Sequence, residues 1–384
     1  MPMNIPLTRP YLGDEEKAAL AEVLESGWLT QGSRVTDFEN AVSRFLGVPH
    51  AIACSNCTTA LHLALLLFHI GPGDEVIIPS YTWIASANVV RMVGAKPVFT
   101  DIDLETFNII PSTIEAVITR RSRAIMPVHQ FGLPADMDAI MDLARKRNLF
   151  VIEDAACALG SRYKGKPVGS LGNVTCFSFH PRKVITTGEG GMLVTENSGW
   201  AEQARSLLNH GASISDLAKH KANTVESLLA EKFPQVGYNY RMTNLQGALG
   251  VIQMQRMNEI LEKRRTRAEI YSKTFRDLPY ILPPYVPDYA SPNWQSYAIR
   301  INDDNPAKRD AIVQCLLNAK IACRPAYMAC HVQPVYKEVS NPLSLPNTEK
   351  ALRTVIILPL YPQMTDEEQE YVMEKISAAI KEFG

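Results

Sequence analysis

Short apolar runs alternate with longer amphipathic segments along the chain from about residue 48 onward. The apolar runs predict β-strands at 51–54, 74–79, 96–103, 123–129, 150–156, 174–179 and 190–196. Helical character follows some of these runs, as in TTALHLALLLF after the first and ASANVVRMV after the second. Strands that alternate with helices form right-handed crossovers. The pattern therefore predicts an α/β fold whose central sheet is mostly parallel, with helices on both faces.

A different pattern begins near residue 244. One long helical stretch is predicted over 244–278, and the proline-rich segment 279–292 then indicates a linker or a turn into a second domain. A strand, SYAIRI, and two helices, KRDAIVQCLLNAK and TDEEQEYVMEKISAAIKEF, follow this segment. We therefore expect a large domain over 13–250, a smaller α+β C-terminal domain over 251–384, and an N-terminal segment, 1–12, that packs on the smaller domain.

Composition narrows the choice of partners. Lys and Arg total 39 against 40 Asp and Glu, so the charge balance gives no reason to expect binding to nucleic acid or an anionic membrane. No apolar run approaches the roughly 20 residues of a membrane-spanning helix, and the first residues lack the pattern of a secretory signal. Seven cysteines, an odd number scattered along the chain, argue against a disulfide framework. A cytoplasmic protein with reduced thiols is expected.

Chemically active side chains follow the predicted strands at their carboxyl ends, where ligands bind in sheets of this kind. They are Ser55 and Asn56 after one strand, Glu153 and Asp154 at the end of another, and Ser178, His180 and Lys183 after a third. Three such groups in one chain indicate a binding site at this edge of the sheet.

Lys183 is the candidate nucleophile. The proline of the preceding HPR ends the strand, and Gly188, Gly190 and Gly191 allow tight turns and close approach to a bound group. In a partly desolvated pocket we expect a lowered pKa for this lysine, which would let its amine form a Schiff base. The alternative is a surface lysine in a loop.

Two further features suit pyridoxal phosphate. Asp154 ends the apolar run FVIED, where a carboxylate could face a protonated pyridine nitrogen; an N-cap role for the next helix is the alternative. CSNCTTAL (54–61) places small polar residues at a helix start, which suits either phosphate binding or plain capping. Trp83 could stack on the ring or pack in a core, and His180 could act in acid–base chemistry or be structural.

The same segment contains a competing motif, Cys54-x-x-Cys57. At a helix start this spacing could form a redox pair, because the helix terminus lowers a thiol pKa. A zinc site would need a second CxxC pair, which the sequence lacks, so no metal is expected.

Together these residues make the sequence resemble the DegT/DnrJ/EryC1/StrS family of sugar aminotransferases. That resemblance implies pyridoxal-phosphate enzymes with the aspartate aminotransferase fold, fold type I. It covers nearly the whole chain, through the motifs IPLTRPYLGDEEKAALAEVLESGWLTQG, GPGDEVIIPSYTWIASAN, MPVHQFGLPADMDAI, VIEDAACALGSRYKGKPVGSLGN, FSFHPRKVITTGEGGM, VGYNYRMTNLQGALG and LPLYPQMTDEE. Several motifs in order at family-like spacing are far more specific than any one of them.

The resemblance implies roles for individual residues. Lys183 matches the lysine that links to the cofactor and moves the proton, Asp154 the aspartate at the pyridine nitrogen, and Trp83 the stacking aromatic residue. Further cofactor contacts are implied for Thr58, Cys57, Ser178, Cys157 and, from the neighbouring subunit of a homodimer with shared sites, Asn239. The substrate candidates are His331, His180 and Tyr327.

Two of these positions depart from the family pattern. Cys57 stands where relatives usually have glycine. Cys157 stands where many relatives have Gln, Glu or His close to the phenolic oxygen of the ring. A thiol is a weaker hydrogen-bonding partner than any of these three side chains.

The activity implied is transfer of an amino group from L-glutamate or glutamine to a keto group of a nucleotide-linked sugar. A 4-keto-6-deoxy sugar in amino-sugar or surface-polysaccharide biosynthesis is the expected substrate. One alternative is a pyridoxal-phosphate sugar dehydratase on the same scaffold, but that branch carries histidine at the position of Lys183. The other is a non-catalytic regulatory protein that retains the fold.

Overall fold

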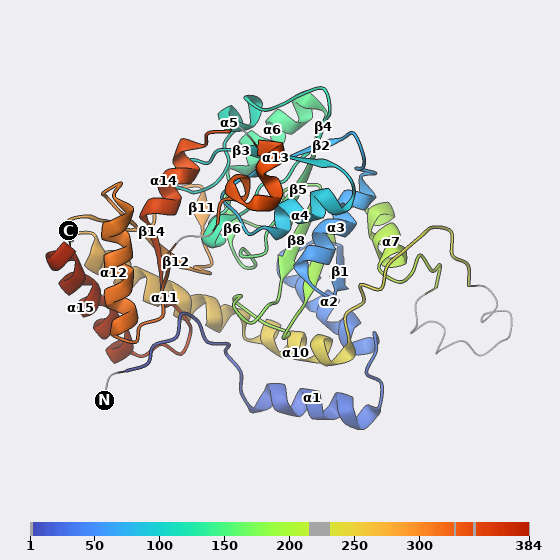
Figure 1. Ribbon diagram of the computed structural model, residues 1–384. Coiled ribbons are helices and arrows are strands. Elements are labelled where there is room, and N and C mark those ends of the chain that lie inside the picture. The colour runs from blue at the N-terminus through green and yellow to red at the C-terminus, as the bar shows by residue number, and fades with distance from the viewer. Residues whose placement is uncertain (1–2, 215–230, 326–327, 341–342, 384) are drawn as a thin grey trace.

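The computed structural model describes residues 3–214, 231–325, 328–340 and 343–383. Within these residues the strands of the first half form one seven-stranded sheet in the order β1-β9-β8-β5-β4-β2-β3 (Figure 1). The strands are β1 (His50–Cys54), β2 (Glu75–Pro79), β3 (Lys96–Thr100), β4 (Ser122–Ile125), β5 (Phe150–Asp154), β8 (Val174–Ser178) and β9 (Gly191–Thr195).

Strand direction in this sheet follows the predicted crossovers. β3, β2, β4, β5 and β8 pair in parallel, while β9 is antiparallel to both of its neighbours, β8 and β1. β9 therefore runs against the other strands of the sheet. The predicted fold class, an α/β protein with a mostly parallel central sheet, is confirmed.

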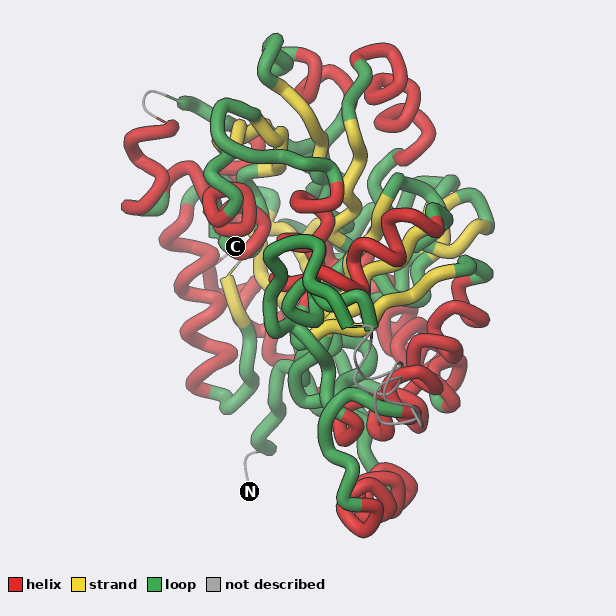
Figure 2. The backbone as a smooth tube through the Cα atoms, turned by 90° about the vertical axis from the view of Figure 1, so that its right-hand side faces the viewer, coloured by secondary structure: helices red, strands yellow, loops and turns green. Residues whose placement is uncertain are grey.

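Helices cover both faces because alternate strand residues are apolar on both sides of the sheet. Ile52, Val76 and Ile152 pack with α3, α4 and α7, whereas Ile77 and Val151 pack with α6 on the opposite face. Figure 2 shows the strands running between these helices. The helices of this half are α1 (Asp14–Ser26), α2 (Ser33–Leu46), α3 (Cys57–Leu67), α4 (Ala85–Met92), α5 (Pro111–Glu115), α6 (Met137–Arg147), α7 (Ser198–Leu207) and α10 (Asn244–Gln255), with the 3-10 turn η1 (Gln130–Gly132).

The stretch predicted as one long helix, 244–278, is two helices. α10 ends at Gln255 and α11 (Met257–Phe275) begins two residues later, because Arg256 adopts φ −89° and ψ 0°. At this bend the side chain of Arg256 extends to α1, where its guanidinium forms ion pairs with Glu15 at 2.5 Å and Glu16 at 3.3 Å. The sequence gives no glycine or proline at the bend, so the prediction missed it.

A second, antiparallel sheet lies in the last third of the chain, in the order β10-β12-β14-β13. Its strands are β10 (Ile281–Leu282), β12 (Tyr297–Ile301), β13 (Arg324–Pro325) and β14 (Val355–Leu358). The same third of the chain contains α12 (Pro306–Asn318), α13 (Lys337–Ser340), α14 (Pro346–Thr354), α15 (Asp366–Phe383) and the turns η2 (Cys330–Val332) and η3 (Pro334–Tyr336). Cys330 of η2 and Tyr336 of η3 pack in the core cluster of the large sheet. A three-stranded sheet joins β11 (Ala290–Ser291) to β6 (Arg162–Tyr163) and β7 (Lys166–Pro167).

The N-terminal segment contacts this last third. Ile5 forms a parallel bridge with Ile321 and belongs to the same buried cluster as the inner faces of α12 and α15. Along α11, Ile260 packs with the large sheet, whereas Ala268 belongs to the C-terminal cluster. The domain boundary between residues 250 and 251 stays a prediction. No helix of the described residues is both long and apolar enough to cross a membrane.

Gly191 shows how tightly β9 packs on the start of α3. A Cβ at this position would lie 2.3 Å from the backbone carbonyl of Asn56, and neither strand nor helix start can yield cheaply. We expect Gly191→Ala to lower the free energy of unfolding by about 1–3 kcal/mol, because overpacking forces backbone shifts. Urea unfolding of the variant checks this.

Gly71→Ala is the matched control. Its Cβ would lie 3.8 Å from the carbonyl oxygen of Val93, an ordinary contact, so its unfolding free energy is expected to change by less than about 0.5 kcal/mol. Equal stability of Gly191→Ala and the wild type would contradict the close approach of β9 and α3.

Candidate active site

Several of the predicted site residues lie at one edge of the large sheet. In the register of the strands, Gly191 at the start of β9 pairs with Cys54 on one side and with Ser178 on the other. Asp154 at the end of β5 pairs with Cys176 of β8. The ends of β1, β5 and β8 and the start of β9 therefore form a continuous row.

Lys183 is held in a turn after β8. Its backbone N–H donates to the carbonyl of His180 at 2.8 Å, and its Nζ donates to Sγ of Cys157 at 3.1 Å. The lysine is half-buried, so it is not a surface residue of a loop. The structure therefore places the amine beside the thiol of Cys157, in the turn after β5.

The expected lowering of the Lys183 pKa is wrong. Burial alone lowers the pKa of this ammonium group, but the thiols of Cys157 and Cys57 and the carboxylate of Asp154 outweigh burial, and the net pKa is raised. The sequence predicted only the burial, because the nearby thiols could not be placed from spacing.

Asp154 is buried, with 5% of its surface exposed. Its Oδ2 accepts a hydrogen bond of 2.7 Å from the hydroxyl of Ser86, and its Oδ1 accepts one of 3.2 Å from the backbone N–H of Ala156. Among the described residues these hydrogen-bond donors are neutral. A buried carboxylate whose hydrogen bonds come from neutral groups favours a further, cationic partner.

The start of α3 offers an anion site. The side chain of Asn56 caps the helix by accepting from the N–H of Thr59 at 2.9 Å, and its carbonyl accepts from the N–H of Ala60 at 3.2 Å. In the described part of the chain this leaves the first-turn N–H groups of Cys57 and Thr58 for an external acceptor. Thr58 is half-buried, so its hydroxyl can also donate.

Three more predicted residues lie around this edge. Ser178 is buried at the end of β8, where its Oγ accepts from the N–H of His180 at 3.4 Å. Burial lowers the pKa of His180, whose Nδ1 accepts from the N–H of Arg182 at 3.2 Å. Trp83, after β2, is 58% exposed, so it is not a core tryptophan. Its carbonyl accepts from the N–H of Ser86, which ties it to the Asp154 contact.

The remaining candidates have other surroundings. His331 is buried on η2, with Nδ1 2.6 Å from the hydroxyl of Ser80 and Nε2 3.7 Å from Glu349, and burial lowers its pKa. Asn239 is exposed in the segment that crosses the end of β1, where Ser55 donates to the carbonyl of Tyr240. Tyr327 lies outside the described residues.

The Cys54-x-x-Cys57 pair does not have the chemistry of a redox site. Burial raises the pKa of Cys54 to about 12 and raises that of Cys57 well above its ordinary value. A redox pair needs a thiolate at neutral pH, so this motif is structural. No group of three or more potential metal ligands occurs among the described residues.

Sequence reasoning missed several supporting residues. Ser86 contacts Asp154 from α4, and Gln295 donates to the carbonyl of Arg182 from the segment before β12. Glu153, the neighbour of Asp154, faces away from the site. Its carboxylate lies 2.9 Å from Nε2 of the buried His129 and accepts a hydrogen bond of 2.6 Å from the hydroxyl of Thr175. The alternation of strand residues could have separated Glu153 from Asp154.

These groups fit pyridoxal phosphate. An amine in a half-buried turn, a buried carboxylate with neutral donors, and unused N–H groups at a helix start lie along one sheet edge. They match an aldehyde, a protonated ring nitrogen and a phosphate, respectively. The backbone of β9 approaches this helix start closely at Gly191, where a Cβ would collide with Asn56.

Comparisons with known proteins point the same way. A model of the DegT/DnrJ/EryC1/StrS aminotransferase family matches residues 10–377. The aminotransferase TlmJ from Streptoalloteichus hindustanus is 30% identical, with a TM-score of 0.92 and full coverage of both chains. PseC from Helicobacter pylori, an aminotransferase involved in the biosynthesis of pseudoaminic acid, is 29% identical, with a TM-score of 0.92 and coverage of 99% of this chain and 100% of its own.

A third similar structure, Spr1654 from Streptococcus pneumoniae, has been solved with its cofactor. Its PLP form is 28% identical, with a TM-score of 0.91 and full coverage of both chains. Its PMP form has a TM-score of 0.92 at the same identity and covers 99% of this chain and 100% of its own.

Proposed function

Because this chain belongs to the DegT/DnrJ/EryC1/StrS aminotransferase family, we propose that it transfers an amino group from L-glutamate or L-glutamine to a keto group of a nucleotide-linked sugar. The cofactor is pyridoxal phosphate. The observation that carries the proposal is the Lys183 amine beside Cys157, at the same sheet edge as buried Asp154. The similarity to PseC, which takes part in the biosynthesis of pseudoaminic acid, supports a sugar as the amino acceptor.

Different residues around this edge would hold different parts of the cofactor. Lys183 would hold the aldehyde carbon, Asp154 the protonated ring nitrogen, and the start of α3 with Thr58 and Ser178 the phosphate. Trp83 offers an exposed ring for stacking. When bound, the cofactor supplies an electron sink for the pair left at the amino acid Cα after proton loss.

Lys183 also serves as the acid–base group. With the amino donor bound, its Nζ would take the proton from the donor Cα and give it back on the cofactor side. Cys157 holds the released amine in place through the Sγ contact. The side chain of Asp154 would face the ring nitrogen and so favour its protonated form.

A homodimer with shared active sites completes the proposal. Asn239 is exposed on the segment beside the end of β1, so its amide is accessible to a second copy of the chain. In that dimer Asn239 would reach the cofactor phosphate of the partner site. The acceptor proposed is a 4-keto-6-deoxy sugar linked to a nucleotide, in amino-sugar or surface-polysaccharide biosynthesis.

The amino-donor half of the reaction tests this function. The protein loaded with pyridoxal phosphate is expected to release one equivalent of 2-oxoglutarate from L-glutamate and to convert its cofactor to the amino form, since each half-reaction runs alone in a ping-pong scheme. Absorbance and keto-acid assays without any acceptor check this, and L-glutamine and L-alanine are run in parallel.

The amino-acceptor half then selects the substrate. Nucleotide-linked sugars with a keto group at C4 or C3, and a cyclitol ketone, are added to the aminated enzyme. The 4-keto-6-deoxy sugar is expected to restore the starting absorbance fastest. A loaded protein that releases no keto acid from glutamate or glutamine would contradict aminotransfer and favour a dehydratase or a regulatory protein.

A further inference from the structure

A short segment before β12 holds the turn that carries the cofactor lysine. Asn293 and Gln295 are both buried, and their side chains reach the large domain from the C-terminal third of the chain. We refer to residues 293–295 as the strap.

One end of the strap binds the segment of Cys157. The amide nitrogen of Asn293 donates to the carbonyls of Cys157 and Leu159, each at 2.8 Å, and its backbone N–H donates to the hydroxyl of Ser161 at 3.1 Å. Its amide oxygen accepts from the N–H of Gln295 at 2.8 Å. The Asn293 side chain thus fixes the backbone whose thiol contacts Lys183.

The other end binds the turn of Lys183 itself. Nε2 of Gln295 donates to the carbonyl of Arg182, the residue before the lysine. Lys183 and Cys157 are in contact, so the two amides of the strap hold both sides of one pair. Oε1 of Gln295 is buried without a hydrogen-bond partner among the described residues, so the Arg182 carbonyl is the contact that orients this amide.

The strap is anchored in the C-terminal third by a buried arginine. Nη1 of Arg264, on α11, donates to the carbonyls of Trp294 at 3.0 Å and of Gln295 and Leu360 at 3.3 Å each. Burial lowers the pKa of Arg264 to about 10, so it stays charged at neutral pH. These carbonyls stabilise the buried charge and fix the strap to α11.

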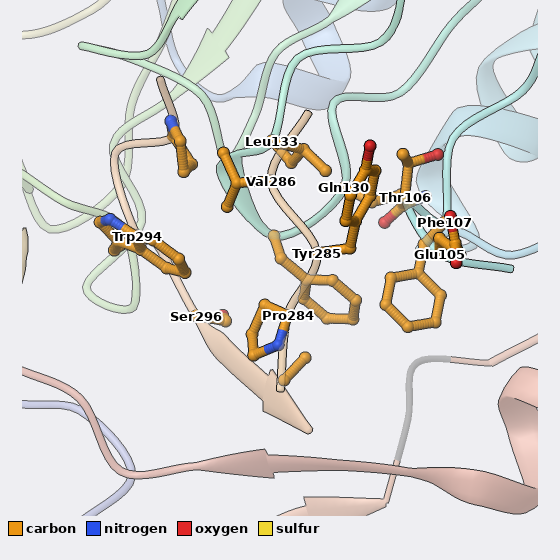
Figure 3. Close-up of a pocket in the computed structure, with 13 residues that line it drawn as sticks. Glu105, Thr106, Phe107, Gln130, Leu133, Pro284, Tyr285, Val286, Trp294 and Ser296 are labelled. Carbon is orange, nitrogen blue, oxygen red and sulfur yellow. The ribbon is translucent and has the colours of Figure 1, made fainter. Parts of the chain in front are cut away.

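The backbone of the strap turns at Trp294. Its φ of 54° lies in the left-handed region, a strained conformation for a non-glycine residue. In Figure 3 its ring lines a small pocket beside Pro284 and Ser296, with Tyr285 and Phe107 further along the same pocket. The side-chain contacts of Asn293 and Gln295, on either side of Trp294, hold the backbone in this strained conformation.

We propose that Gln295 is a positioning residue for Lys183: its amide fixes the Arg182 carbonyl and thereby sets where the lysine amine lies. This inference rests on the proposed function. Without the amide contact the turn is free to move, Nζ leaves Sγ of Cys157, and the amine no longer meets the reacting carbons. A displacement of the amine by about 1 Å is expected to lower kcat roughly 10- to 100-fold.

Gln295→Met tests the inference, since methionine keeps the length of the side chain and removes the donor. The loaded variant is expected to show a shift of roughly half a unit or more in the pH titration of its cofactor absorbance, with kcat reduced and KM little changed. In cofactor-free protein, acetic anhydride is expected to label Lys183 at least about three times faster, relative to exposed Lys17 as an internal reference.

Two more variants complete the design. Gln295→Leu also lacks the donor and adds no charge beside Lys183, so it is expected to act in the same direction. Ser296→Ala changes the next side chain and leaves its backbone N–H on the carbonyl of Phe131, so it is expected to match the wild type.

The outcomes distinguish a positioning role of Gln295 from a purely structural one. The positioning role would be overturned if both Gln295 variants kept the wild-type pH titration of the cofactor absorbance and the wild-type rate of Lys183 labelling. It would also be overturned if the variants had a lower melting temperature but neither of these two readouts changed. A wild-type protein that binds pyridoxal phosphate without a link to Lys183 would contradict the proposed function, while the labelling of cofactor-free protein would still decide the role of Gln295.

Discussion

Replacing Lys183 by alanine is expected to abolish turnover, with kcat falling by at least about 10³-fold. Proton transfer by a positioned side chain contributes roughly 10²- to 10⁴-fold, and in the proposed function this lysine also makes the covalent link to the cofactor. The visible absorbance of lysine-bound pyridoxal phosphate should vanish, although Asp154 and the start of α3 can still hold the cofactor. Absorbance spectra and keto-acid release from L-glutamate measure both effects.

Lys17→Ala is the control for this variant. Lys17 lies on the surface of α1, where its partner is Asp14 at 2.8 Å, so its loss is expected to leave absorbance and turnover unchanged. Cys157 loses a donor in Lys183→Ala, so the melting temperatures of both variants are compared with that of the wild type. Transamination retained by Lys183→Ala would refute its role.

Asp154→Asn should have the second largest effect, a loss of roughly 10²- to 10³-fold in kcat. The amide keeps the shape of the side chain and an acceptor for Ser86. It removes the charge that, in the proposed function, stabilises the protonated ring nitrogen. Breaking a buried charge pair costs about 3–5 kcal/mol, and each 1.36 kcal/mol is about tenfold in rate. Steady-state kinetics and the spectrum of the bound cofactor check this.

Asp138→Asn is the matched control for the charge. Asp138 is an exposed carboxylate, and its ion pair with Lys164 at 2.7 Å holds its pKa below the ordinary value. Its replacement is expected to leave kcat unchanged. If Asp154→Asn kept kcat within about threefold of the wild type, the ring nitrogen would not depend on this carboxylate.

The sheet and its site edge could be predicted from sequence because the signals are local. Apolar runs set the strands, and polar residues at their carboxyl ends set the edge, so Asp154, Ser178 and Lys183 are found without knowledge of the tertiary contacts. The antiparallel course of β9 could not be read this way, since its residues are apolar on both faces like those of its parallel neighbours.

The supporting contacts could not be predicted because they join residues far apart in the chain. Ser86 and Asp154 are separated by 68 positions, and Gln295 and Arg182 by 113. Serine in a helix and glutamine before a strand carry no signal of such partners. The pKa of Lys183 was predicted in the wrong direction for the same reason, because Cys157 is 26 residues away.

Cys157 lies where the family resemblance places a partner for the phenolic oxygen of the ring, and its thiol contacts the amine of Lys183. The cysteine is half-buried, so both partners remain within reach of a ligand in the site. The departure from the family pattern is therefore compatible with the lysine chemistry.

Borohydride reduction of the purified protein, followed by peptide mapping, is the most direct test of the central claim. Reduction of protein saturated with pyridoxal phosphate makes its link to a lysine permanent, so the modified peptide identifies that lysine. One phosphopyridoxyl group per chain on Lys183 is the expected result. Modification of another lysine, or a protein that takes up no chromophore when the cofactor is supplied, would contradict the account.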